Sequence, residues 1–269
     1  MFAKLLKYEW KSASPVLAIL SLCALAAGLL GGGVMRFLIY CTEQLNTGND
    51  AFGVLMLLAM LVLMGLFLAI MAYVAGSQIM LFYRFYKSRF TDEGYLTFTL
   101  PVSAGQVFWS SYLVILGWML ICVVVMLLSF GAILLLGTLG KLSWAEFQDS
   151  FSIYAEIYDS LPGGTVITGI VTVVSFLANI VYYMTAITVG SIIAKKHKLL
   201  AAIGVYIGAS FVMSMITGTL SLFAAIFAYT ASANTITFVY VMEIIFSLAM
   251  ATGGCALNIY LMKNKLNLP

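Results

Sequence analysis

The chain has 269 residues, of which 63% are hydrophobic and 9% are charged, with a formal net charge of +3. This composition excludes an ordinary soluble domain, in which about a quarter of the residues are charged. Nucleic-acid binding is excluded as well, because the basic clusters are short and no nucleic-acid-binding motif accompanies them.

Six apolar runs fill the chain, and each is long enough to cross a bilayer, for which about 20 residues suffice. They are Pro15–Met35, Phe52–Leu81, Val107–Leu139, Val166–Ala194, Leu199–Tyr229 and Ile236–Met262. We therefore predict an all-α integral membrane protein, with six transmembrane helices in a single transmembrane domain over residues 1–269. Because five runs follow the first, we expect the first to be a retained span and not a signal peptide.

The basic residues predict how these spans are oriented. All but two of the 13 Lys and Arg lie at the N-terminus, in the second and fourth connections, and at the C-terminus. The exceptions, Arg36 and Lys141, lie in connections that are otherwise acidic. Since cytoplasmic connections carry an excess of Lys and Arg, we predict that both termini are cytoplasmic.

Residues 1–14 predict an amphipathic helix. Its apolar residues recur at helical spacing and its lysines fall on the other face. The apolar residues are Phe2, Leu5, Leu6 and Trp10, and the lysines are Lys4, Lys7 and Lys11. Such a helix lies at the inner membrane surface with its lysines at the lipid headgroups. It serves either as a membrane anchor or as a lever that links a cytoplasmic partner to the first span.

The connection at residues 83–106 is the most informative loop. After the basic end of the second run come two acids, a glycine and a series of large apolar residues. These residues are Asp92, Glu93, Gly94, Tyr95, Leu96, Phe98 and Leu100. Pro101 ends the segment, and Ser103 with Gln106 forms a capping box that starts the third helix. We expect a short helix seated in a groove of a partner, or else a loop folded onto the membrane surface.

The connection at residues 140–164 predicts an acidic amphipathic helix on the outer face. Its large apolar residues are spaced three or four apart: Trp144, Phe147, Phe151, Tyr154, Tyr158 and Leu161. A capping box of Ser143 and Glu146 starts the helix, and Pro162-Gly163-Gly164 ends it. The helix either packs on the outer membrane surface or the spans, or acts as a lid or attractor for cationic substrate.

Polar residues inside the spans are candidates for a transport pathway. One face of the fourth run carries Thr172, Ser175, Asn179 and Tyr182, which either line a wet pathway or form hydrogen bonds between helices. Glu243 is the one ionisable residue well inside a run. Such a carboxylate is either a functional site or a residue that reaches the outer interface.

Glycines suggest two further features of the spans. Gly28-x-x-x-Gly32 and Gly204-x-x-x-Gly208 are small-residue pairs of the kind found at helix dimer seams. The fifth run carries Gly204, Gly208 and Gly218, and we consider it the best candidate for a re-entrant segment.

The sequence has no motif for catalysis or metal binding. It lacks H-E-x-x-H, G-x-S-x-G and a P-loop, and its four cysteines have no zinc-site spacing. We therefore predict that the chain is not itself an enzyme and holds no metal. If ATP is used, another chain must bind it.

The stretch Asp92–Val102 reads DEGYLTFTLPV. Together with the basic N-terminus and the six spans, it resembles type-2 ABC exporter permeases, in particular the small permeases of Gram-positive bacteria that carry this loop. The resemblance covers the whole chain in topology and is specific only around this loop. One departure is that larger relatives place their main outer domain between spans five and six, whereas here the outer helix lies between spans three and four.

The resemblance implies a half-transporter in the bacterial cytoplasmic membrane. Two permease chains, as a homodimer or a mixed pair, would work with two separate P-loop ATPase subunits that bind ATP and Mg. Asp92–Leu100 would form the coupling helix, and Lys4, Lys7, Trp10 and Lys11 would belong to the connecting helix.

The implied cargo is a peptide, an antibiotic, a lipid or a polysaccharide, so peptide export and antimicrobial resistance are the expected roles. Two alternatives stay open. One is an ion-coupled secondary transporter with Glu243 as its proton site, and the other is a non-transporting membrane sensor or immunity protein.

Overall fold

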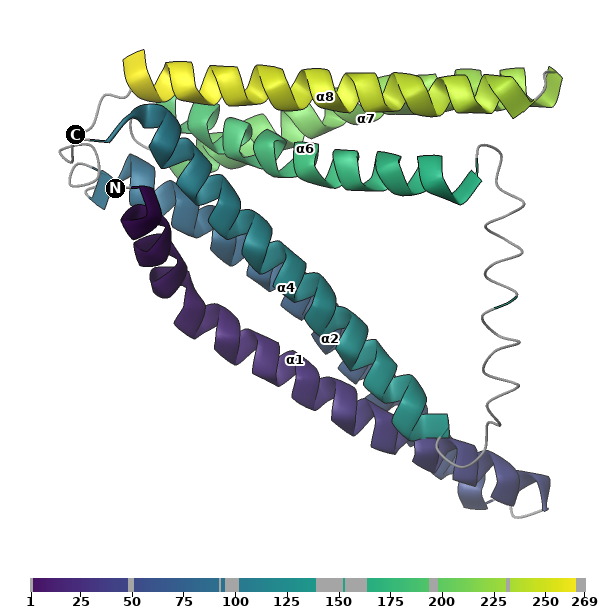
Figure 1. Cartoon of the computed structure of the whole chain (residues 1–269). Coiled ribbons are helices and arrows are strands. Elements are labelled where there is room, and N and C mark those ends of the chain that lie inside the picture. Colours follow the sequence, from purple (N-terminus) through teal and green to yellow (C-terminus); the bar gives the residue numbers. More distant parts are fainter. Residues whose placement is uncertain are drawn as a thin grey trace. The chain divides into compact units, whose positions relative to one another are not determined.

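The computed structural model of the chain is all-α, with six helices long and apolar enough to span a membrane (Figure 1). It describes residues 2–47, 51–91, 93–94, 102–138, 152, 164–193, 198–230 and 233–264. The helices are α1 (Phe2–Asn46), α2 (Ala51–Phe90), α4 (Ala104–Thr138), α6 (Gly164–Ile193), α7 (Lys198–Thr230) and α8 (Ala233–Asn264). The predicted multi-pass membrane protein is thereby confirmed, while the orientation of its helices across the membrane stays a prediction. The outer helix predicted over residues 140–164 lies outside the described residues, apart from its last residue and Ser152.

Two helices are longer than the apolar runs that predicted them. α1 has 45 residues, and at about 1.5 Å per residue it exceeds the ~30 Å hydrocarbon core roughly twofold. Residues 36–46, predicted as part of a polar connection, belong to this helix. α2 likewise continues through the basic residues after Leu81 to Phe90. Hydropathy marks where apolar surface ends, whereas a helix continues for as long as its backbone hydrogen bonds do.

α1 also passes Pro15 without a break. Proline has no N–H, so it cannot donate to the carbonyl four residues earlier, that of Lys11. The Ser14 hydroxyl donates to this carbonyl instead, at 3.0 Å. The side chain thus replaces the missing backbone bond, and the predicted N-terminal helix is continuous with the first span.

α7 is an uninterrupted helix that includes Gly204, Gly208 and Gly218. The prediction of a re-entrant segment in the fifth run is therefore wrong. Each glycine costs a helix only about 1 kcal/mol relative to alanine, which an otherwise apolar 33-residue helix tolerates.

The chain forms two compact units. The first comprises Met1–Leu6, Phe82–Leu116 and Phe151–Pro269, and the second comprises Lys7–Leu81 and Gly117–Ser150. In the second unit α1, α2 and α4 pack together (Figure 1) around Ala24, Tyr73, Cys122 and Val125. Whether the whole chain acts as one domain stays a prediction.

Glycines set the contact between α1 and α4 in the second unit. A Cβ at Gly28 would lie 2.6 Å from Ser129 Cα, and one at Gly32 would lie 2.6 Å from Leu136 Cβ. Ser129 Oγ donates to Ala24 O at 3.1 Å across the same contact. The pair Gly28-x-x-x-Gly32 is therefore used inside the chain, where the sequence had suggested a dimer seam.

In the first unit α6 packs against both α7 and α8 (Figure 1). Towards α7, a Cβ at Gly190 would collide with the backbone of Ala202. Towards α8, Asn258 is fully buried, donates to Thr185 Oγ1 at 2.7 Å and accepts from Thr188 Oγ1 at 2.6 Å. Close backbone approach and a polar bridge thus hold the three helices together, as is common between helices in membranes.

Candidate functional site

The strongest candidate site is the loop between α2 and α4, which the sequence singled out. The structure describes only Glu93 and Gly94 of its seven predicted site residues. Asp92, Tyr95, Leu96, Phe98 and Leu100 lie outside the described residues. The geometry of the site therefore comes from the end of α2, the turn at Glu93 and Gly94, and the start of α4.

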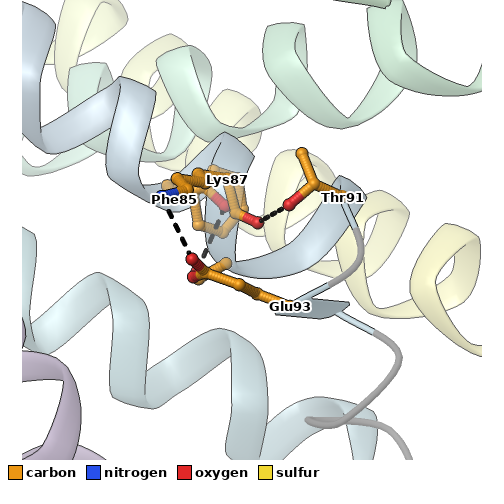
Figure 2. A network of polar contacts seen from close by, with 5 residues as sticks. Phe85, Lys87, Thr91 and Glu93 are labelled. Carbon is orange, nitrogen blue, oxygen red and sulfur yellow. Dashed lines mark hydrogen bonds and ion pairs between the residues drawn. The ribbon is translucent and has the colours of Figure 1, made fainter.

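Glu93 turns back onto the last turns of α2. Its Oε1 lies 3.2 Å from Lys87 Nζ, with both side chains about half exposed (Figure 2). Thr91 Oγ1 donates to the Lys87 carbonyl (Figure 2). An exposed ion pair of this kind contributes about 0–1 kcal/mol, so it orients the start of the loop more than it stabilises the fold.

Gly94 makes this turn possible. Its backbone N–H donates to the Thr91 carbonyl at 2.8 Å. A Cβ at this position would lie 2.8 Å from the Arg89 carbonyl carbon and would collide with the oxygen. Only glycine allows so close a return over the end of a helix, so the turn at Glu93 and Gly94 is shaped by its own backbone.

The capping box predicted at the other end of the loop is confirmed. Gln106 N donates to Ser103 Oγ at 3.3 Å, and Ser103 N donates to Gln106 Oε1 at 3.4 Å. The two side chains satisfy backbone donors that the helix itself leaves without partners. α4 thus begins at Ala104, directly after the loop.

Arg89 connects the two ends of the loop. This side chain is 1% exposed, and its Nη2 donates to Ser111 Oγ at 2.8 Å and to Val107 O at 3.4 Å. Phe85 and Phe108 are also buried, at 3% and 0% exposure. A buried cation requires such hydrogen bonds, because taking it out of water costs several kcal/mol. By its sequence position Arg89 belongs to the basic residues of the second connection, whereas the structure buries its side chain inside the protein.

The predicted connecting helix is part of α1, and its lysines and its tryptophan have different surroundings. Lys4, Lys7 and Lys11 are exposed, as expected for cations at the lipid headgroups or against a partner. Trp10 stacks on Trp118 of α4 with ring centroids 5.1 Å apart. Its ring also lies 2.6 Å from where a Cβ on Gly117 would be. One face of the tryptophan therefore packs on protein, while the side chain stays 37% exposed.

Two of the candidate pathway residues form bridges between helices. Ser175 Oγ lies 3.4 Å from Ser247 Oγ of α8. Tyr182 OH lies 3.2 Å from Ser210 Oγ of α7. Of the two interpretations of this polar face, these contacts fit hydrogen bonding between helices.

The other candidate pathway residues have a different environment. Asn179 is exposed and donates to Ser175 O of its own helix at 2.9 Å. Thr172 and Glu243 are exposed on α6 and α8. Because Ser175 pairs with Ser247 and the two helices run parallel, Glu243 lies one turn before that contact on α8, at about the level of Thr172. The structure does not bring the five residues together around one point.

Sequence reasoning missed two buried polar clusters, Arg89 with Ser111 and Asn258 with the α6 threonines. The available signal was weak: an arginine just before a loop, paired serines early in an apolar run, and one asparagine in the sixth run. Which side chains these residues meet depends on helix register, and composition does not reveal it.

Among the described residues, no three His, Cys, Asp or Glu side chains are placed to hold a metal ion. The chain matches none of the protein-family models, curated proteins or solved structures with which it was compared. The features that bear on its function are therefore its spans, its loop and the resemblance carried by Asp92–Val102.

Proposed function

We propose that the chain is the membrane-embedded permease subunit of an ATP-driven exporter whose ATPase is a separate subunit. Its cargo is an amphipathic molecule such as a peptide, an antibiotic or a lipid. Two permease chains would form the pathway in the cytoplasmic membrane. The observation that carries the proposal is the loop between α2 and α4, whose sequence resembles that of small exporter permeases and whose two ends are both anchored.

A subunit that receives mechanical work from a soluble partner needs a contact loop that moves its helices when the partner moves, and does not simply change its own conformation. The first end of this loop is shaped by Gly94 and by the pair of Lys87 and Glu93. The second end is capped by Ser103 and Gln106. With both ends defined, a partner that docks between them would move the helices along with the loop.

The N-terminal segment gives a second route for the same motion. Trp10 packs on α4 at Gly117 and Trp118. In the proposed complex this segment is the connecting helix, so a displacement of it would reach α4 as well as the rest of α1. This contact favours the lever interpretation of residues 1–14 over that of a simple anchor.

The proposal is tested by affinity purification of the tagged chain from native membranes in mild detergent, with mass spectrometry of the proteins that come with it. We expect a small P-loop ATPase in a ratio near one to one. Replacing Tyr95 and Phe98 together by alanine should lower its recovery, because these side chains would seat the loop. The matched control replaces Phe37 and Tyr40, an exposed Phe and Tyr with the same spacing on α1, and should leave recovery unchanged.

A purification without any ATPase, from cells shown to express one, would refute the proposal. The ion-coupled transporter would then be the better hypothesis, with Glu243 as its proton site. In that case Glu243→Gln and collapse of the proton gradient should each abolish transport in vesicles. Absence of any flux would leave the sensor or immunity protein.

A further inference from the structure

We infer that Arg89 is the positioning residue of the loop between α2 and α4: it clamps the last turn of α2 to the first turns of α4, so that force applied to the loop moves α4. The inference rests on the proposed function of that loop and assigns the residue that makes the loop an effective coupler.

The clamp joins positions far apart in sequence at the base of the loop. Arg89 is the penultimate residue of α2, and its partners Val107 and Ser111 lie in the first two turns of α4. The bonds therefore span 18 and 22 residues and close the loop between them. A loop with joined ends has fewer conformations than one with free ends, and a load on it passes to the helices.

Arginine suits this task because of its shape. The planar guanidinium can donate to several acceptors in a fixed arrangement, whereas a lysine ammonium acts as a point charge on a flexible stem. Ser111 Oγ, which accepts one of the bonds, donates in turn to Val107 O at 3.2 Å, so the acceptor is itself held in place. Together these bonds define both the distance and the angle between the helix ends.

The surroundings strengthen the clamp. Val107 and Phe108 are fully buried, and Phe85 and Phe90 are nearly so. Where water is excluded, hydrogen bonds are electrostatically stronger than at the surface. Arg89 lies in the last turn of α2, where the helix dipole favours a cation, and faces the start of α4, where the dipole disfavours one. The hydrogen bonds of Arg89 therefore define the geometry of the joint, which these opposing dipoles would not.

The clamp is tested by measuring the distance between spin labels on either side of it. Labels at Ser88→Cys and Gly105→Cys suit this purpose, because Ser88 bonds only a carbonyl of its own helix and a Cβ at Gly105 meets open space. The full-length chain, with its four native cysteines replaced, is reconstituted in lipid nanodiscs. We expect one narrow distance distribution in the parent and a broad one in Arg89→Gln.

The size of the change follows from the bonds removed. Losing a hydrogen bond to a charged group should lower the ratio of clamped to unclamped molecules about tenfold. Ser111→Ala and Arg89→Lys should broaden the distribution less than Arg89→Gln does. If Arg89→Gln does not fold, these two variants test whether Arg89 clamps the helices. The controls are Arg84→Gln, which removes the same charge from the preceding turns of α2, and Ser191→Ala, a buried serine bonded to its own helix. Both should leave the distribution narrow.

A second measurement separates this inference from the proposed function. In the complex with its co-purified ATPase, Mg-ATP with vanadate should change the mobility of a spin label at Leu113 of α4. Arg89→Gln should abolish that response while the ATPase is still recovered. A narrow distribution in all three clamp variants, or a response that persists in Arg89→Gln, would overturn the inference. If no ATPase binds the parent chain, the proposed function fails, and the distance measurement alone decides whether Arg89 clamps the loop.

Discussion

Gly28 offers the sharpest test of how the second unit packs. In Gly28→Ala the new Cβ would lie 2.6 Å from Ser129 Cα and 2.7 Å from Ser129 O. These are backbone atoms, so no change of rotamer relieves the contact, and α1 and α4 must move apart. Moving apart also weakens the bond from Ser129 Oγ to Ala24 O.

The magnitude follows from three contributions. Overpacking of a well-packed contact costs about 1–3 kcal/mol, and an interhelical hydrogen bond in a membrane contributes about 0.6 kcal/mol. Alanine is better than glycine in a helix by about 0.5–1 kcal/mol. We therefore expect Gly28→Ala to destabilise the protein by about 1–3 kcal/mol in free energy of unfolding.

The assay is reversible unfolding of the purified chain in mixed micelles with a rising fraction of SDS, followed by circular dichroism. The matched control is Gly33→Ala on the same helix, where a Cβ meets no atom within 4 Å. This control should be neutral or slightly stabilising. Equal midpoints for the two variants would refute the packing of α1 on α4 through Gly28.

Three further predictions concern the first unit. Gly190→Ala should lower the unfolding midpoint because its Cβ would collide with the α7 backbone, whereas Gly204→Ala, which meets open space, should not; similar midpoints would contradict this contact. Asn258→Leu should destabilise the protein by about 1–2 kcal/mol, from the loss of two interhelical bonds, and an unchanged midpoint would mean that this bridge is not formed. Gln106→Ala should cost about 0.5–2 kcal/mol by removing half of a capping box; in a double-mutant cycle with Ser103→Ala the two effects should couple, and strict additivity would argue against the box.

Much of the local structure was predictable because its causes are local. The apolar runs predicted α4, α6 and α7 closely at both ends, since each run is bounded by polar or turn-forming residues. The capping box at Ser103 and Gln106 was read correctly from four consecutive positions. The full length of α1 was not predicted, because Ser14 compensates for Pro15 and the polar residues after Met35 sustain a helix.

In the candidate site, too, some features were predictable from the sequence and others were not. The sequence of the loop predicts a contact segment, and this stays a prediction, while Glu93 with Gly94 shows how the loop leaves α2. The burial of Arg89 was missed, because a basic residue at the end of an apolar run ordinarily reaches the headgroups. The polar face of α6 was recognised, but its partners on α7 and α8 were not.

The sequence by itself determined that this is a multi-pass membrane protein, because the transfer of a segment into lipid depends on that segment's own composition and length. Only the tertiary structure decided which residues meet across the helices: Gly28 with Ser129, Trp10 with Trp118, Arg89 with Ser111. These contacts depend on the register between helices that are far apart in the chain. Lipid solvates every apolar face alike, so hydropathy contains no information about which faces pair.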